Sequence, residues 1–232
     1  VKIVSTSQFQ SGRIPGYKYT IEEQQEMITM DDIKRMEEDG TITVTIDAEE
    51  IVTGSHNLSF VKNVIAASAI AIHLGIDWDT FREKVKSFQA PQGRCEVKQL
   101  NNITIIDDTY NANPSSFYSV LENLNKTYPG LRKIVVCGAM AELGDLSPEL
   151  HRQVGETMVK NGVEKMFGLG GAEIKFYLEG WKNGGGKTEA AQRFSDIDDL
   201  TKTFREELRA SDVVLVKGSR SAQMERFVEA ML

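Results

Sequence analysis

The sequence lacks a cysteine framework, an excess of positive charge and a long apolar run, and each absence excludes a class of protein. Its two cysteines, Cys95 and Cys137, are far apart without metal-ligand spacing, and both fall in strand-like runs. We therefore expect buried, reduced thiols and a cytoplasmic protein. The net charge of −7 argues against a nucleic-acid-binding surface. No apolar run approaches the length of a membrane span.

The sequence also contains no phosphate-loop motif, although one short run of residues resembles the end of that motif. Residues Gly184 to Thr188 read Gly-Gly-Gly-Lys-Thr. A phosphate loop needs a further glycine five positions before Gly186, where this sequence has Trp181, together with a preceding strand and a following helix. The pattern here predicts a helix before the run and a weak strand after it. We interpret the run as a solvated loop.

From about residue 93 onward, strand-like and helical segments alternate. The expected strands are 103–107, 133–138, 165–169, 191–194 and 213–217, and the expected helices are 114–128, 148–161, 172–181, 197–210 and 222–231. Asn101-Asn102 predicts a hairpin that joins residues 95–100 to the first of these strands. Such alternation predicts an α/β domain with a mostly parallel sheet flanked by helices. The break at Pro91 to Gly93 indicates a domain boundary between residues 92 and 93.

Residues 1–92 have a weaker pattern. Alternating Thr, Ile and Val predict a strand at 41–46, paired with 50–53 across a turn. Apolar periodicity predicts helices over 60–74 and from Asp77 or Asp79 to 88, with a further strand at 1–6 and a helix at 30–38. A chain that begins in mid-strand without methionine is expected to be a piece of something longer.

The densest group of functional side chains follows the strand at 103–107. Asp107 and Asp108 come first, followed by Tyr110, Asn111 and Asn113. Ligands bind at the carboxyl ends of strands in open α/β sheets, so this stretch is a candidate site. Asn113 can also cap the next helix, with Pro114 at its first position. A turn rich in Asx residues with a helix cap is an equally good interpretation.

Three other motifs carry chemistry. Arg94, at the domain boundary, is either a planar cation for a phosphate or part of a surface Arg–Glu pair. Residues 137–144 follow the second parallel strand; Glu142 there faces a cleft or solvent, Ser147 is expected to cap the next helix, and His151 is expected to be structural. Residues 217–221 end the last strand, where Lys217 and Arg220 beside a helix start predict an anion site.

Five motifs occur in the order typical of the Mur ligase family, and together they resemble it. They are Gly54-Ser55-His56-Asn57, Gly93-Arg94, Asp107 to Pro114, Met140 to Gly144 with His151, and Lys217 to Ser221. The resemblance implies that residues 1–92 are the C-terminal part of a central ATPase domain. It implies that residues 93–232 form a Rossmann-like domain that binds the incoming amino acid or dipeptide.

The resemblance also implies roles for individual residues. On the nucleotide side it implies Asn57 at the adenine, Arg94 on phosphate and Asp108 on the ribose or an ordered water, with Tyr110 and Asn111 lining the cleft. On the dipeptide side it implies Asn113, Lys217, Ser219 and Arg220, the last three at the carboxylate. It assigns no catalytic residue and no metal ligand within this sequence.

Mur ligases are ATP-dependent enzymes that add amino acids to the peptidoglycan precursor through an acyl phosphate. The likeness is greatest to members that add D-Ala-D-Ala to a UDP-MurNAc-peptide. The family's phosphate loop, metal-binding glutamate and modified lysine are absent here and are expected in upstream domains, where ATP and Mg²⁺ would bind. We therefore expect this chain to be inactive alone. The alternative is a non-catalytic Rossmann-like module that binds a nucleotide or peptide.

Overall fold

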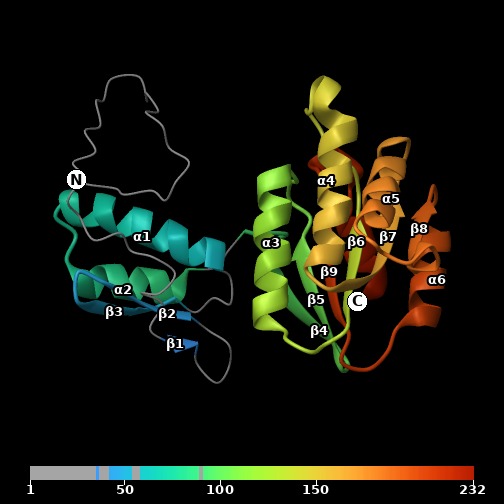
Figure 1. Ribbon diagram of the computed structural model, residues 1–232. Coiled ribbons are helices and arrows are strands. Elements are labelled where there is room, and N and C mark those ends of the chain that lie inside the picture. The colour runs from blue at the N-terminus through green and yellow to red at the C-terminus, as the bar shows by residue number, and fades with distance from the viewer. Residues whose placement is uncertain (1–34, 37–41, 54–57, 89–90) are drawn as a thin grey trace. The chain divides into compact units, whose positions relative to one another are not determined.

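The computed structural model describes residues 35–36, 42–53, 58–88 and 91–232. The chain divides into two compact units, residues 1–89 and 90–232, which are coloured from blue to red along the chain in Figure 1. The expectations for residues 1–6 and for Asn57 lie outside the described residues. Within the described ranges, no helix combines the length and apolar character that crossing a membrane requires.

The first unit contains a small antiparallel sheet and two helices. Its elements are β1 (Arg35–Met36), β2 (Ile42–Ile46), β3 (Glu49–Val52), α1 (Leu58–His73) and α2 (Trp78–Ser87). The predicted hairpin and both predicted helices from residue 58 onward are confirmed. The helix expected over 30–38 is wrong at Arg35–Met36, which pair with β2. Pairing with an open strand edge outweighs the local helical pattern there.

The second unit contains a six-stranded sheet with the order β4-β5-β9-β6-β7-β8. The strands are β4 (Glu96–Leu100), β5 (Ile103–Asp108), β6 (Lys133–Cys137), β7 (Val163–Leu169), β8 (Ala191–Phe194) and β9 (Val213–Lys217). β4 and β5 form the expected antiparallel hairpin, and all other neighbouring pairs are parallel. The predicted mostly parallel sheet is confirmed.

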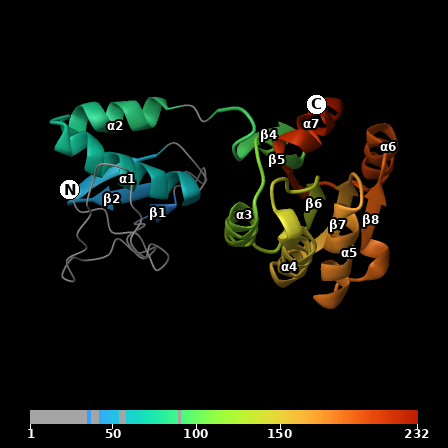
Figure 2. The same ribbon diagram turned by 90° about the horizontal axis from the view of Figure 1, so that it is seen from above.

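Helices cover both faces of this sheet. They are α3 (Pro114–Thr127), α4 (Ser147–Lys160), α5 (Glu173–Asn183), α6 (Ile197–Glu207) and α7 (Glu225–Met231). Seen from above, α3, α4 and α5 lie on one side of the sheet and α6 and α7 on the other (Figure 2). The connections from β5 to β8 therefore use one face, and the chain returns to β9 across the opposite face.

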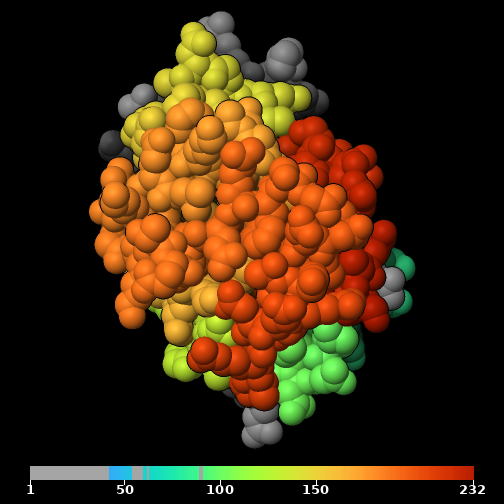
Figure 3. Space-filling model, turned by 90° about the vertical axis from the view of Figure 1, so that its right-hand side faces the viewer, coloured from blue at the N-terminus to red at the C-terminus, as the bar shows by residue number. Residues whose placement is uncertain are grey.

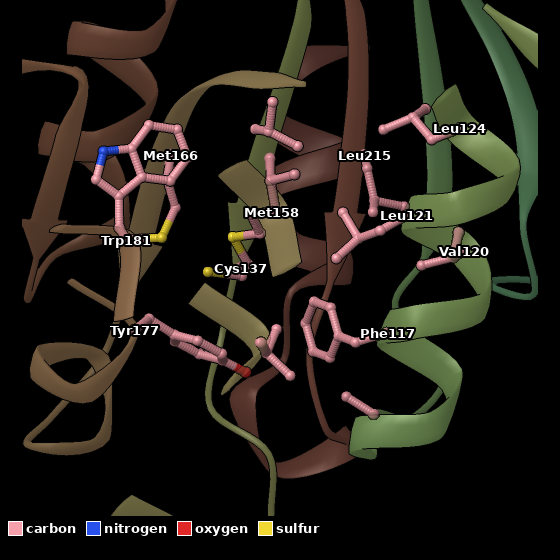
Figure 4. Close-up of a cluster of buried hydrophobic side chains, with 14 of the residues drawn as sticks. Phe117, Val120, Leu121, Leu124, Cys137, Met158, Met166, Tyr177, Trp181 and Leu215 are labelled. Carbon is pink, nitrogen blue, oxygen red and sulfur yellow. The ribbon is translucent and has the colours of Figure 1, made fainter. Parts of the chain in front are cut away.

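Alternating side chains on the central strands build two cores. In β9, Val213 and Leu215 belong to the core beneath α3, α4 and α5, whereas Val214 and Val216 belong to the core beneath α6 and α7. Figure 4 shows the first core, in which Phe117 approaches from α3 and Tyr177 from α5. Because both faces are buried, the central strands are apolar at every interior position, as parallel strands usually are.

Two helix starts differ from the sequence prediction. Ser147 does not cap α4 with its side chain; a 3₁₀ turn over Gly144–Leu146 runs directly into the helix, and Ser147 is its first residue. α7 begins at Glu225, after a 3₁₀ turn over Arg220–Ala222 and a left-handed residue, Gln223. In both places a 3₁₀ turn lies where the sequence pattern predicted the start of the helix.

The glycine run at 184–186 lies in a loop between α5 and β8. Figure 3 shows the face beside β8, formed mainly by the orange segments from α5 to α6. The indole Nε1 of Trp181 donates to the Lys187 carbonyl at 2.9 Å, which closes the loop against the helix. A helix precedes the run and a short 3₁₀ turn and strand follow it, so the rejection of a phosphate loop is confirmed.

Candidate functional site

The candidate site lies where the chain leaves β9 in a different direction from its two neighbours. After β5 and β6 the chain continues into α3 and α4 on one face, whereas after β9 it continues into α7 on the other. Loops that diverge in this way leave a crevice at the carboxyl ends of the strands. Register places Asp108 beside Lys217 and Lys217 beside Cys137. From the sequence we also expect the loop after β5 and the loop after β9 to form opposite walls of one pocket. The structure places the two loops at the same edge of the sheet, which is the arrangement that a shared pocket requires.

Lys217 is the central charge of this edge. Its side chain is 1% exposed, and its Nζ lies 2.5 Å from Asp108 Oδ2. It also donates to the Asn111 carbonyl at 3.0 Å and lies 5.3 Å from the centre of the Phe117 ring. A buried ammonium needs such partners, because removing a charge from water is costly. Lys217 therefore ties the loop after β5 to the end of β9.

Asp107 forms a separate ion pair with a second lysine, Lys98. Its side chain is 2% exposed and accepts from Lys98 Nζ at 2.7 Å, while Thr109 Oγ1 donates to its second oxygen at 2.7 Å. Burial alone would lower the pKa of Lys98, but the hydrogen bond and charge of Asp107 raise it overall. Successive strand residues point to opposite faces, so the two adjacent aspartates meet their lysines on opposite faces of the sheet, Lys98 from β4 and Lys217 from β9.

Arg94 and Tyr110 stack beside this network. The guanidinium carbon of Arg94 lies 4.1 Å from the centre of the Tyr110 ring, and the tyrosine is 46% exposed. Gly93 has a positive φ of 73°, and a Cβ there would lie 2.9 Å from Thr109 Oγ1. The Gly93 carbonyl also accepts from the Tyr110 amide at 2.9 Å. The planar cation is thus held open to solvent on an aromatic ring.

The two asparagines of the loop are engaged locally. Asn113 Oδ1 accepts from the Ser116 amide at 2.8 Å, and the Ser116 hydroxyl accepts from the Asn113 amide at 3.1 Å. This is a capping box, so the predicted cap of α3 is confirmed. Asn111 Oδ1 accepts from the next amide, Ala112, at 2.8 Å. The structure therefore gives Asn113 a capping role.

A cleft of about 590 Å³ opens beside Lys217 at the ends of β6, β7 and β9. Three segments line it, and they are residues 139–144 with Ser147, residues 169–171 with Glu173, and Ser219 with Ser221 and Ala222. Of the residues expected on the dipeptide side, Ser219 lines this cleft, while Asn113, Lys217 and Arg220 are not part of its lining. The Arg220 side chain is 71% exposed, with Nη1 3.3 Å from Glu225 Oε1.

The loops after β6 and β9 touch through their backbones. The Gly138 amide donates to the Lys217 carbonyl at 2.9 Å, and the Ser219 amide donates to the Ala139 carbonyl at 3.0 Å. A Cβ on Gly138 would lie 2.4 Å from the Ala222 Cβ, so only glycine permits this approach. The buried Ser219 hydroxyl lies 3.0 Å from that of Ser221, within hydrogen-bonding distance.

Sequence analysis missed the third wall of the cleft. Gly170, Gly171 and Glu173 follow β7, and the glycine pair at a strand's carboxyl end was the available signal. Lys98 was also missed, although the predicted hairpin of β4 with β5 was a signal that could have found it. Among the described residues, no cluster of three or more His, Cys, Asp or Glu side chains is arranged to hold a metal ion.

The buried groups beneath the cleft are held neutral. Burial raises the pKa of the Cys137 thiol to about 12. Burial also raises the pKa of Tyr177, whose hydroxyl lies 3.4 Å from the Gly138 carbonyl. A thiol with such a pKa carries almost no thiolate near pH 7, so Cys137 is an inert packing residue, as expected from the sequence. The same expectation is wrong for Cys95, which is only partly buried because it lies in the turn just before β4.

Comparison with known proteins assigns the sheet unit. Residues 93–220 match the domain described as "Mur ligase, glutamate ligase domain". The chain is 31% identical to UDP-N-acetylmuramoyl-tripeptide–D-alanyl-D-alanine ligase of Synechocystis, with 84% of this chain and 43% of that protein covered. It is 32% identical to the Escherichia coli ligase of the same name, with 82% of this chain and 40% of that protein covered. The chain thus spans less than half the length of these relatives.

A solved structure gives the same result. The MurF ligase of Thermotoga maritima, crystallised with ADP, superposes with a TM-score of 0.69 at 28% identity. That comparison covers 83% of this chain and 43% of the other. The predicted Rossmann-like architecture is therefore confirmed.

Proposed function

This chain belongs to the Mur ligase family, and on that premise we propose that it is the C-terminal part of an ATP-dependent, ADP-forming ligase. The proposed reaction joins D-alanyl-D-alanine to a UDP-MurNAc-peptide through an acyl phosphate, as a cytoplasmic step of peptidoglycan precursor synthesis. Residues 93–232 would be the domain that receives the dipeptide, and residues 1–92 the end of the central domain. The relatives' names and the matched domain support this proposal.

The observation that carries the proposal is the convergence of three motif loops at one sheet edge. Asp108 and Lys217 lie 109 residues apart in sequence, yet their side chains form an ion pair. The loop after β6 contacts the loop after β9 beside them. An amide-forming site must hold two substrates side by side, and this edge offers a stacked cation on one side of Lys217 and a cleft on the other.

The cleft suits a small zwitterion. Its volume of about 590 Å³ falls in the range of small-molecule sites. D-Alanyl-D-alanine carries an ammonium and a carboxylate at neutral pH. In our proposal Glu142 and Glu173 face the ammonium, while the hydroxyls of Ser219 and Ser221 donate to the carboxylate, with Arg220 nearby. Lys217 does not line the cleft, and it contributes by fixing the position of the turn that contains Ser219.

On the nucleotide side, the chain offers only part of a site. Arg94 supplies one planar cation suited to a phosphate, and Asp108 and Asn111 supply oxygen acceptors suited to ribose hydroxyls. Tyr110 holds Arg94 in place, and Asn57 is proposed at the adenine. A phosphate cradle and a metal-ligand cluster are absent from the described residues, so we assign ATP phosphates and Mg²⁺ to upstream domains.

The test is a titration of D-alanyl-D-alanine into the chain, followed by amide chemical shifts. We expect shifts that cluster at residues 140–144, 170–173 and 219–221, and a Ser219→Ala, Ser221→Ala variant that binds roughly ten-fold more weakly. Ser115→Ala, at an exposed position on α3, is the matched control. Shifts clustered elsewhere, or none at millimolar dipeptide, would contradict the cleft assignment.

The binding-module alternative makes a different prediction. A free-standing module should bind ATP tightly by itself, whereas the ligase proposal predicts weak ATP binding and no ADP release by this chain. Calorimetry with ATP, and an ADP assay with UDP-MurNAc-tripeptide and D-alanyl-D-alanine, separate the two. Arg94→Ala should abolish the residual ATP binding if Arg94 contacts a phosphate.

A further inference from the structure

His151 is a buried histidine that the proposed reaction does not use. It lies in the first turns of α4 and is 0% exposed. Its Nδ1 lies 2.6 Å from the Ser147 carbonyl, and its Nε2 accepts from the Met140 amide at 3.0 Å. Its ring packs edge-on against Tyr177, with the ring centres 4.6 Å apart. Both ring nitrogens therefore face backbone groups of fixed polarity.

Those two partners determine the protonation state of the ring. A carbonyl oxygen only accepts, so Nδ1 must carry the hydrogen that points at Ser147. A backbone amide only donates, so Nε2 must be bare where it meets Met140. The ring is therefore neutral and in the Nδ1–H form. The Ser147 hydroxyl, 3.3 Å from Nδ1, fits this arrangement as a second acceptor.

The residue that His151 holds lies near the start of one wall of the cleft, directly after Ala139. Met140 is buried, and the next four residues line the cleft. Glu142 in this wall has a positive φ of 62°, a conformation that costs free energy in a non-glycine residue. A segment of this kind keeps its shape only when its ends are fixed. Its far end runs into α4 through the 3₁₀ turn, and its near end is fixed by His151.

We infer that His151 is a positioning residue that holds the 140–144 wall of the cleft through a hydrogen bond from the Met140 amide to its unprotonated Nε2. The inference rests on the proposed function only in taking the cleft as the dipeptide site. His151 does not touch the cleft itself, so it acts through the backbone. Its loss should loosen the wall and weaken binding while the sheet stays folded.

Protonation should have the same effect as loss. A hydrogen on Nε2 would point at the Met140 amide, replacing an attraction with a repulsion. Burial lowers the pKa of His151, while its bond to Ser147 and the charge of Glu173 on α5 act in the opposite direction. The other titratable groups here, Tyr177 on α5 and Cys137 on β6, have raised pKa values and stay neutral. The wall should therefore remain fixed near pH 7 and loosen under acid conditions.

The first experiment reads the ring directly. Long-range ¹H–¹⁵N spectra of the chain contain three histidines, His56, His73 and His151, which single substitutions assign. We expect His151 to show the Nδ1–H form, with a titration midpoint below that of an exposed histidine. The amide shifts of residues 140–144 should move with the same midpoint. An Nε2–H form, or loop shifts independent of His151, would overturn the inference.

The second experiment uses paired substitutions. His151→Gln keeps an acceptor near the Nε2 position but cannot titrate, so the Met140 amide should stay protected from exchange and the acid-dependent loop shifts should vanish. His151→Leu removes the acceptor, and exchange at residues 140–144 should rise at least ten-fold. His73→Gln, at an exposed position near the end of α1, is the control. Unchanged exchange in a folded His151→Leu protein would refute the inference.

These readouts do not depend on any ligand. If the wall loosens in His151→Leu but D-alanyl-D-alanine binds neither protein, the positioning role stands and the proposed function fails. If exchange at residues 140–144 is unchanged in a folded His151→Leu protein while the dipeptide still binds through the cleft, the proposed function stands and the positioning role fails. Should His151→Leu not fold, the His151→Gln titration and the ring spectra still decide between the outcomes.

Discussion

At the scale of single residues, the site is a set of buried charges that satisfy one another. Asp107 pairs with Lys98 and Asp108 pairs with Lys217, and each pair joins two strands. Such pairs add little net stability over well-packed apolar residues, but removing one partner leaves an uncompensated charge. Their value is geometric, since they fix where the loop after β5 lies relative to the end of β9.

Substituting Lys217 should therefore cost much more than substituting a surface lysine. Lys217→Met leaves the Asp108 carboxylate, which is only 13% exposed, without its partner and should lower the free energy of unfolding by about 3 kcal/mol, as for other broken buried pairs. Lys126→Met, which removes an exposed pair with Glu122, should change it by less than about 1 kcal/mol. Urea denaturation followed by circular dichroism measures both. Equal effects would show that Lys217 is not constrained by Asp108.

His151 also predicts a pH dependence of stability. Its pKa is lowered in the folded protein, so between the folded and unfolded pKa values the unfolded chain binds more protons. The contribution of the neutral His151 ring to the free energy of unfolding is fully present above the pKa of histidine in the unfolded chain, about 6.5. It is lost as the pH falls through the lower pKa of His151 in the folded protein. Urea midpoints from pH 8 to pH 5 should fall less steeply in His151→Gln than in the native chain. Parallel curves would contradict this assignment.

At the scale of elements, close backbone contact between strand-end loops decides the shape of the cleft. The loops after β6 and β9 exchange two backbone hydrogen bonds, and Gly138 lies against Ala222 where they meet. Ser221 and Ala222 lie in the 3₁₀ turn over residues 220–222, and both line the cleft. The sequence pattern instead predicted that the helix begins at residue 222. The cleft thus depends on a turn that displaces the start of α7.

Gly138→Ala should separate these loops. The added methyl group would lie 2.4 Å from the Ala222 Cβ, so one loop must shift, and overpacking of this kind typically costs about 1–3 kcal/mol. The second substitution Ala222→Gly removes the opposing atom and should restore part of the stability. Thermal melts of both proteins test this. A double variant no more stable than Gly138→Ala would show that the strain arises elsewhere.

At the scale of the whole molecule, the two units differ in completeness. The second unit has helices on both faces of its sheet and two buried cores that share the central strands. The first unit has one described cluster of buried residues, between its small sheet and its helices. The second unit therefore contains all the layers that an independent α/β domain needs.

Residues 93–232 alone should accordingly fold. We expect a single cooperative thermal transition and the same Met140 amide protection as in the full chain, because among the described residues the two cores of this unit contain none before Cys95. Calorimetry and amide exchange of the excised segment test the expectation. A broad, non-cooperative melt would mean that residues 1–92 supply part of its stability.

The sequence by itself determined the elements and their order. Period-two and helical patterns, with Asn113 as a cap, identified each strand and helix of the second unit, because these signals act between residues near one another in the chain. Strand ends also identified Asp108 and Lys217 as separate candidate site residues, whereas Ser219 was named only through the family resemblance. They failed at Arg35–Met36 and at the start of α7, where pairing and a tight turn override local preference.

Only the tertiary structure decided which of those residues lie together. It inserts β9 between β5 and β6, so Lys217 is buried against Asp108 and the cleft forms between the loops after β6, β7 and β9. It also places the His151 ring between two backbone groups of opposite polarity. Strand order and burial depend on contacts between residues far apart in the chain, and local sequence patterns carry no record of those contacts.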